Sequence, residues 1–151
     1  MKFSKIILFS GVLFALCVSS RVVAHAQEHP HYLRALSDLR MMRGYLDKQT
    51  PDERIDDESL RAIQEIDAAI QEIKAASIDD HKDLHDAMPP DARLTYSDRY
   101  RKARESGDAA WHDVDQAEDN GAVKGLKHRA LDHIEKANHI VDGIMKRYQH
   151  K

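Results

Sequence analysis

The sequence is poor in cysteine, which stabilises many small proteins through disulfides or bound cofactors, and in aromatic residues. Its 151 residues include one cysteine, Cys17, and no Cys-x-x-Cys-His motif, which excludes an intramolecular disulfide and covalently attached haem. Aromatic residues make up only 6% of the chain, and no stretch alternates apolar and polar residues as a β-strand would. A core must therefore come mainly from aliphatic side chains at helical spacing.

Only one long apolar run is present, at residues 6–18, and Lys2 and Lys5 precede it. This run is too short to cross a membrane, which takes about 20 residues. A basic start, an apolar centre and a small-x-small site ending at Ala26 are typical of a secretory signal peptide. We therefore expect residues 1–26 to be cleaved off and the protein to be periplasmic or secreted.

Basic residues are outnumbered by acidic ones. Three of the 23 Lys and Arg residues would leave with the signal peptide, so 20 would face all 26 Asp and Glu residues, a net charge of about −6. Such a chain has no basic face with which to bind the phosphates of nucleic acid or anionic lipid. We expect one domain, residues 27–151, that binds no nucleic acid, does not insert into a membrane and has metal ions or envelope proteins as its partners.

Apolar residues recur at helical spacing over four stretches. The predicted helices cover about residues 30–47, 51–87, 97–117 and 122–148. Pro30 suits a first helical position, Thr50 with Glu53 matches a capping box, and Pro89 ends the second helix. This pattern predicts an all-α domain, an antiparallel four-helix bundle in up-down-up-down order.

An internal repeat relates the two halves of the chain. The stretches 61–69 and 129–137 align without gaps, and the same offset pairs Tyr32 with Tyr100 and Ala35 with Ala103. We therefore hypothesise that the bundle is a duplicated helical hairpin.

In up-down-up-down order, the start of the first helix would share one end of the bundle with the end of the second. Tyr32, Tyr96, Tyr100 and Tyr148 would gather there too. A second helix reaching residue 87 would place His81 and His85 one turn apart, a known two-ligand arm. Without thiolates, imidazole and carboxylate suit zinc, copper or nickel. The predicted metal ligands are His81, His85, His29, His31 and Asp83; the alternative is an ordinary solvated helix end.

Other histidines favour structural roles. A stripe along the fourth helix lies nearly opposite its apolar seam and is predicted to face solvent. His133 flanks the core and is predicted to be packed or hydrogen-bonded. A third group beside the third-helix seam is predicted to form surface ion pairs. The stripe comprises His128, Asp132, Glu135, His139 and Asp142, and the third group Asp108, His112 and Asp115.

Three blocks carry a resemblance: HPHYLRALSDLR, EIDAAIQEIKAASIDDHKDL and AEDNGAVKGLKHRALDHIEKA. They resemble a family of small exported bacterial helical-bundle proteins without established activity. The resemblance implies a helical bundle and glycine at the position of His81. The fragment HIEKA is also faintly similar to the small metal-binding protein family.

Three function hypotheses follow. The first is an exported bundle that binds or buffers divalent transition metals. The second is a structural or interaction module of the cell envelope without a metal site. The third is noncovalent haem binding, with Met88, His29 or His150 as axial ligands. We expect no enzyme, because the chain has no H-E-x-x-H, no paired E-x-x-H and no glycine-rich phosphate loop.

Overall fold

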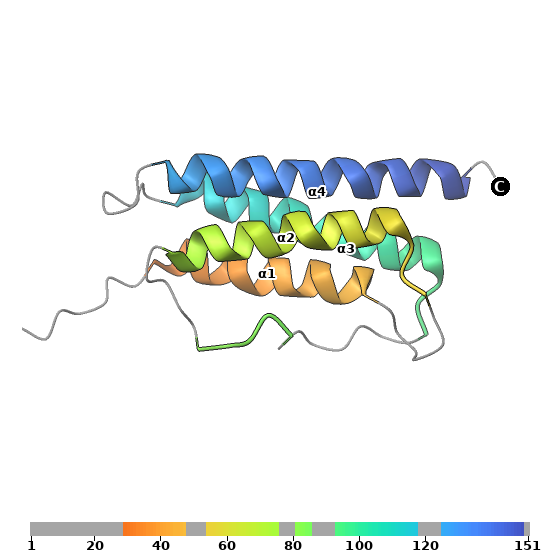
Figure 1. Cartoon of the computed structure of the whole chain (residues 1–151), viewed down its shortest axis with the longest axis horizontal. Coiled ribbons are helices and arrows are strands. Elements are labelled where there is room, and N and C mark those ends of the chain that lie inside the picture. Colours follow the sequence, from red (N-terminus) through yellow and green to blue (C-terminus); the bar gives the residue numbers. More distant parts are fainter. Residues whose placement is uncertain (1–28, 48–53, 76–80, 86–92, 118–124, 150–151) are drawn as a thin grey trace, which may run out of the picture.

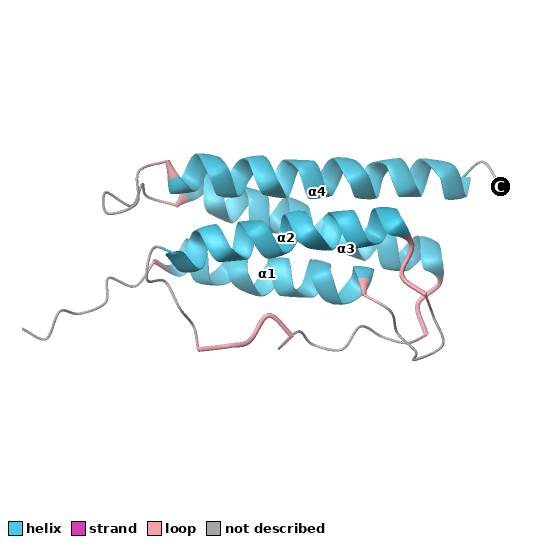
Figure 2. Cartoon of the chain, viewed as in Figure 1, coloured by secondary structure: helices cyan, strands magenta, loops and turns pink. Residues whose placement is uncertain are grey.

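The computed structural model describes residues 29–47, 54–75, 81–85, 93–117 and 125–149. These residues form four α-helices and no strand (Figure 2). The helices are α1 (Pro30–Leu46), α2 (Asp57–Ala75), α3 (Tyr96–Gln116) and α4 (Leu126–Gln149). The predicted all-α four-helix bundle is confirmed.

Three helix starts have local causes in the sequence. Pro30 opens α1 at a position where its missing N–H costs nothing. Asp56 caps α2, since its Oδ1 accepts hydrogen bonds from the backbone N–H groups of Glu58 (3.1 Å) and Ser59 (2.7 Å). Thr95 caps α3 by accepting from the N–H of Asp98 (3.2 Å). The predicted cap of α2 at Thr50 was therefore wrong: the helix begins only at Asp57.

The helices form a four-sided bundle. α1 packs on α3, α2 on α4, α3 on α4 and α1 on α2, so that α1 with α4 and α2 with α3 form the diagonals (Figure 1). Every pair of helices in contact runs antiparallel, as hydrogen bonds along the seams show. His31 at the start of α1 reaches Asp113 at the end of α3 (3.2 Å), and Arg129 at the start of α4 donates to Glu72 at the end of α2 (2.8 Å).

The predicted up-down-up-down order was wrong, because α2 and α3 run in the same direction. The hydroxyl of Tyr100 in the first turns of α3 donates to Asp56 at the start of α2 (2.9 Å). Arg147 at the end of α4 donates to Glu58 in the same region (2.6 Å). The order is therefore up-down-down-up, as the colours of Figure 1 show. The starts of α2 and α3 share one end of the bundle with the ends of α1 and α4.

The physical reason is the early end of α2. The helix stops at Ala75 and not near residue 87, so the whole stretch 76–95 separates it from α3. A helix of 19 residues is about 28 Å long, whereas an extended link of this length spans up to about 66 Å. The link is thus long enough to return along the whole bundle. A helix continuing to residue 87 would extend about 18 Å beyond Ala75 without a neighbour to bury its apolar side.

The core consists of small and aliphatic side chains from all four helices. Most of the apolar residues that recur at helical spacing in the sequence are buried, including Leu36, Ile66, Val114 and Ile134. Leu33 is only partly buried, and two of these residues are exposed: Leu60 by 45% and Tyr148 by 43%. In the first turn of α2, Ser59 is buried in place of Leu60, and its hydroxyl donates to Asp56 Oδ2 (3.0 Å).

The predicted repeat fits this arrangement. The offset that aligns 61–69 with 129–137 also superimposes α1 on α3 and α2 on α4, and these are the pairs that pack most extensively. Tyr32 and Tyr100 are both buried, as are Ala35 and Ala103. The two helical hairpins therefore pack against each other through equivalent faces. Their origin by duplication stays a prediction.

Residues 1–28 lie outside the described part of the chain, so the signal peptide and its cleavage after Ala26 stay predictions. None of the four helices combines the length and the apolar character that a membrane span requires.

Candidate functional site

The two histidines of the predicted metal arm do not lie on a helix. Residues 81–85 form a bend and a turn beyond the end of α2. His81 adopts a left-handed backbone conformation (φ 59°), which favours glycine and is costly for other residues. The helical spacing that would present His81 and His85 as one arm is therefore absent, and that part of the prediction was wrong.

This segment is held against the bundle by its backbone. Arg40 of α1 is 2% exposed and donates from Nε to the carbonyl of Asp83 (3.0 Å) and from Nη2 to that of Lys82 (3.2 Å). Lys74 near the end of α2 also donates to the Lys82 carbonyl (2.9 Å). Leu84 packs against the core from the segment. The side chains of His81, Asp83 and His85 remain exposed.

The other two predicted ligands lie elsewhere on α1. His31 and Arg40 are about two and a half helical turns apart, so they point to opposite sides of the helix. His31 contacts Asp113 of α3, and Arg34 donates to its Nδ1 (2.8 Å). The ring of His29 packs edge-on against Tyr32. His81, Asp83 and His85 are thus neighbours in sequence only, and the structure separates His31 from them.

Within the described residues, no three His, Cys, Asp or Glu side chains are grouped as a metal site would need. Of the three haem-ligand candidates, only His29 lies in the described part of the chain. Metal and haem binding both stay predictions.

A different feature stands out at the opposite end from His31. Three tyrosines gather there from the start of α3 and the end of α4. The ring of Tyr148 stacks on those of Tyr96 and Tyr100, with centroids 6.1 and 5.7 Å apart. The guanidinium of Arg99 lies 4.4 Å from the ring centre of Tyr96. We call the surface formed by Tyr96, Tyr100 and Tyr148 the tyrosine end.

Tyr100, the buried tyrosine of the tyrosine end, is held in place by hydrogen bonds. Tyr100 is 2% exposed, and both its hydroxyl and that of Ser59 donate to Asp56 Oδ2. Partial burial alone would raise the pKa of Asp56, but the hydrogen bonds from the Ser59 N–H and from the two hydroxyls outweigh burial and lower it. Burial, with the adjacent Asp56 carboxylate, raises the pKa of Tyr100 to about 12. These contacts tie α3 to α2 across the bundle diagonal.

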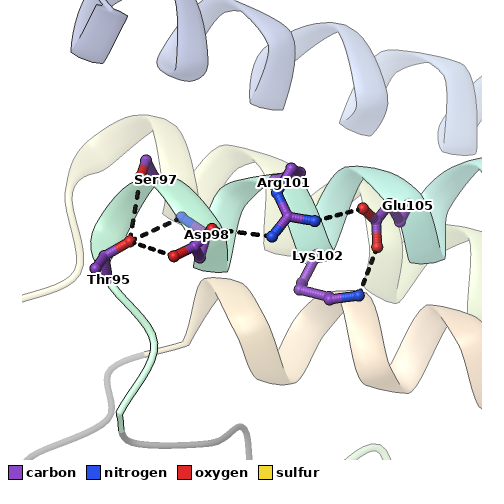
Figure 3. Close-up of polar contacts among 6 residues, drawn as sticks. All are labelled: Thr95, Ser97, Asp98, Arg101, Lys102 and Glu105. Atoms are coloured by element: carbon purple, nitrogen blue, oxygen red, sulfur yellow. Dashed lines mark hydrogen bonds and ion pairs between the residues drawn. The ribbon is translucent and has the colours of Figure 1, made fainter.

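The charged groups beside the tyrosines neutralise one another. Arg101 donates to Asp98 (2.9 Å) and to Glu105 (2.8 Å), which also accepts from Lys102 (2.8 Å) (Figure 3). The hydrogen bond from Arg101 lowers the pKa of Asp98, and those from Lys102 and Arg101 lower that of Glu105. The row of ion pairs along α3 leaves little net charge next to the aromatic rings.

Two clefts flank Tyr148. One, of about 380 Å³, lies between α3 and α4 and is walled by Tyr100, Met145 and Tyr148, with Ser97, Asp98, Arg101 and Gln149 around its rim. The other, of about 210 Å³, lies toward the start of α2 and includes Asp56, Glu58 and Arg147. Tyr96 is 51% exposed and Tyr148 is 43% exposed. Exposed aromatic rings beside a mostly apolar cleft are characteristic of binding surfaces.

Sequence reasoning gathered Tyr96, Tyr100 and Tyr148 at one end, and this is confirmed. It wrongly placed Tyr32 with them and missed the exposure of Tyr148. A usable sign was present: Tyr148 is the last apolar position of α4, where neighbouring helices begin or end, so a large ring there cannot be covered on all sides.

Most predictions for the other polar residues are confirmed, and four of the five residues of the α4 stripe are exposed. Two predictions are not: His112 is hydrogen-bonded to Gln116 (2.7 Å) and forms no ion pair among the described residues, and Asp142 is partly buried. His133 is hydrogen-bonded to Glu65 (2.7 Å). Asp108 pairs with Arg104, and Asp115 lies near Lys127 (3.9 Å). These contacts are surface ion pairs and hydrogen bonds that join neighbouring helices or turns.

Comparison with known proteins adds no assignment: no family model, curated protein or solved structure matches this chain. The resemblance to exported helical-bundle proteins stays a prediction.

Proposed function

We propose that this protein is an exported, non-enzymatic helical bundle that acts as a protein interaction module, and that its contact surface is the tyrosine end. The observation that carries the proposal is the stacked pair Tyr96 and Tyr148, half-exposed beside a cleft of about 380 Å³. Tyrosine, tryptophan and arginine are enriched among the residues that carry most of the binding energy in protein interfaces, and tyrosine buries a large area at low entropic cost.

The chemistry of the cleft favours an apolar or aromatic side chain of a partner polypeptide. Its walls are Tyr100, Met145 and Tyr148, and thioethers adapt to varied apolar shapes. The rim charges of Asp98 and Arg101 are already paired with each other. An uncharged group can therefore enter without leaving a buried charge unpaired.

Photo-crosslinking in producing cells tests the proposal. A benzophenone amino acid replaces Tyr96 in one variant. In a control variant it replaces Gln71, an exposed residue of α2 near the end of the bundle opposite the tyrosine end. We expect one discrete protein adduct from position 96, identified by mass spectrometry and abolished by an added Met145→Asp substitution. Identical adducts from both positions, or none from position 96, would contradict the proposal.

Metal binding by the exposed side chains of His81, Asp83 and His85 is the second hypothesis, supported by their common position on a segment that Arg40 holds in place. Titration with Zn²⁺, Cu²⁺ or Ni²⁺ tests it: a metal at 100 times its Kd would raise the free energy of unfolding by about 2.7 kcal/mol. The rise must disappear in His81→Ala/His85→Ala and persist in His112→Ala/His139→Ala for this site to be correct.

A further inference from the structure

A third cleft, of about 310 Å³, lies in the seam between α3 and α4, away from the tyrosine end. Its α3 wall consists of Arg104, Asp108 and Trp111, which are four and three residues apart and so share one helix face. The α4 wall also shows spacings of three and four residues and consists of Glu135, Asn138, His139 and Asp142.

The register across this seam is set by an ion pair. Arg104 Nε donates to Asp142 Oδ1 (2.9 Å). Because α3 and α4 run antiparallel, moving two turns forward on α3 corresponds to moving two turns back on α4. Trp111 therefore lies opposite Glu135, two turns from the Arg104–Asp142 pair. The cleft thus places an indole ring and a carboxylate on facing walls.

The cleft carries surplus negative charge. One guanidinium, that of Arg104, lies between the carboxylates of Asp108 and Asp142 and can balance only one of them. Glu135 has no ion-pair or hydrogen-bond partner among the described residues. Three carboxylates and one guanidinium leave a net charge of about −2 when His139 is neutral.

Beneath the cleft, the interface between α3 and α4 contains a buried hydrogen-bond acceptor without a partner. Asn138 is only 7% exposed, and its Oδ1 has no hydrogen-bond partner in the described part of the chain. Its amide lies over Gly107, where a Cβ would be 1.9 Å from Oδ1. A buried acceptor without a donor costs free energy. This acceptor is sealed against Gly107 and does not face the cleft, so the cleft offers a ligand its excess of negative charge and the ring of Trp111.

We propose that this cleft binds an organic cation, either an ammonium or a guanidinium group. Such a group supplies N–H donors or positive charge to Glu135 and Asp108, and indole is the best aromatic partner for a cation. The proposal is independent of the tyrosine end. Glu135 and His139 are exposed, as the sequence predicted for this stripe, and Asp142 is partly buried. The cation belongs either to a free amine or to a Lys or Arg side chain of another protein.

Fluorescence gives a site-specific test, because Trp111 is the only tryptophan of the chain. Choline and spermidine probe free amines, and the tripeptide acetyl-Gly-Lys-Gly-amide probes a side chain. Their neutral controls are 3,3-dimethylbutanol and the same tripeptide with norleucine. We expect a saturable change with the cations and none with the controls, weakened when NaCl rises from about 0.05 to about 0.5 M because salt screens exposed charges. If choline or spermidine binds more tightly, the ligand is a free amine; if the lysine tripeptide binds more tightly, it is a side chain of another protein.

Variants locate the effect. Glu135→Gln should weaken binding by about fivefold, the scale of one exposed charged contact. Glu105→Gln removes the same charge from α3 outside the cleft and should change the affinity less than about twofold. Calorimetry with Trp111→Leu, which has no indole, should show a loss of about fivefold. Tyr96→Ala should leave cation binding unchanged, so that failure here is distinguishable from failure of the interaction-module proposal.

Three outcomes would overturn the inference. The first is an equal response to the neutral controls. The second is a response to ZnCl2 or MgCl2 without one to organic cations, which would mark an acidic metal-ion cluster. The third is an equal loss of affinity in Glu135→Gln and Glu105→Gln, which would mark a diffuse charge effect.

Discussion

At the scale of single residues, Gly107 shows how closely α3 and α4 approach. A Cβ at this position would lie 1.9 Å from Asn138 Oδ1 and 2.9 Å from Met42 Sδ. A Cβ at Gly143, on the exposed side of α4, would meet no atom within 4 Å. The two glycines therefore serve different purposes, although both lie inside helices.

The two alanine substitutions should have opposite effects. Gly107→Ala should lower the free energy of unfolding by about 1–3 kcal/mol through overpacking. Gly143→Ala should raise it by up to about 1 kcal/mol, because alanine favours the helix. Urea unfolding measures both. The double variant Gly107→Ala/Asn138→Ala should recover part of the loss, and no recovery would argue against the close contact.

The hydrogen bond from Tyr100 to Asp56 should be visible as a pH dependence. Tyr100→Phe should destabilise the fold by about 1–2 kcal/mol near pH 7, since a donor to a charged acceptor is removed. The pKa of Asp56 is lowered on folding, so its stabilisation is present above pH 3.8 and is lost as the pH falls through the folded pKa. The difference between wild type and variant should therefore shrink in acid.

The same substitution predicts an alkaline difference. The pKa of Tyr100 is raised from 10.0 to about 12, so its stabilisation is complete below pH 10 and is lost as the pH rises through 12. Tyr100→Phe should lack this loss. Unfolding of Tyr45→Phe, which changes a half-buried tyrosine on α1, serves as the control. Parallel pH curves for wild type and Tyr100→Phe would contradict the assignment.

At the scale of elements, the link between α2 and α3 depends on Arg40. Its guanidinium donates to the carbonyls of Lys82 and Asp83 from a nearly buried position. Arg40→Met should accelerate amide exchange in residues 81–85 by about tenfold or more, because these bonds are lost. Arg61→Met, which changes an exposed arginine on α2, should leave that exchange unchanged. Equal exchange in both variants would show that other contacts, such as those of Leu84 and Lys74, hold the segment without Arg40.

Helix ends could be predicted only where a local cause exists. Pro30 and the Thr95 cap fix the starts of α1 and α3 within a residue or so of the prediction. The end of α2 could not be predicted, because the same helical spacing, continued past Ile73 through Ser77 and His81, reaches the apolar Leu84. Spacing alone does not show whether a neighbouring helix is there to cover those residues.

At the scale of the molecule, this single error changed the order of the helices and dispersed the predicted metal ligands. A helix to residue 87 leaves a short joint and makes α2 and α3 antiparallel neighbours. A helix ending at Ala75 leaves a link long enough to span the bundle. The fold class follows from periodicity, whereas the pairing of helix ends depends on link length. Tyr96, Tyr100 and Tyr148 were grouped correctly because α3 and α4 are joined by a short link.

Spin-label distances check the helix order. Cys17 is replaced by serine, and labels are placed at positions 58 and 147 in one variant and at 72 and 147 in another. Arg147 contacts Glu58, whereas Glu72 contacts Arg129, which lies near the opposite end of α4. The 72–147 distance should therefore exceed the 58–147 distance by about 20–25 Å. The opposite ranking would restore the up-down-up-down order.

The packing of α1 on α3 and of α2 on α4 suggests that the two hairpins do not need a covalent connection to stay together. The interface between the two hairpins is more extensive than the contact of α1 with α2. The link at 76–95 then serves largely as a tether that keeps one half at a millimolar effective concentration around the other. A protease nick in this tether should leave the halves associated, and two separately made fragments should reconstitute the bundle as a heterodimer.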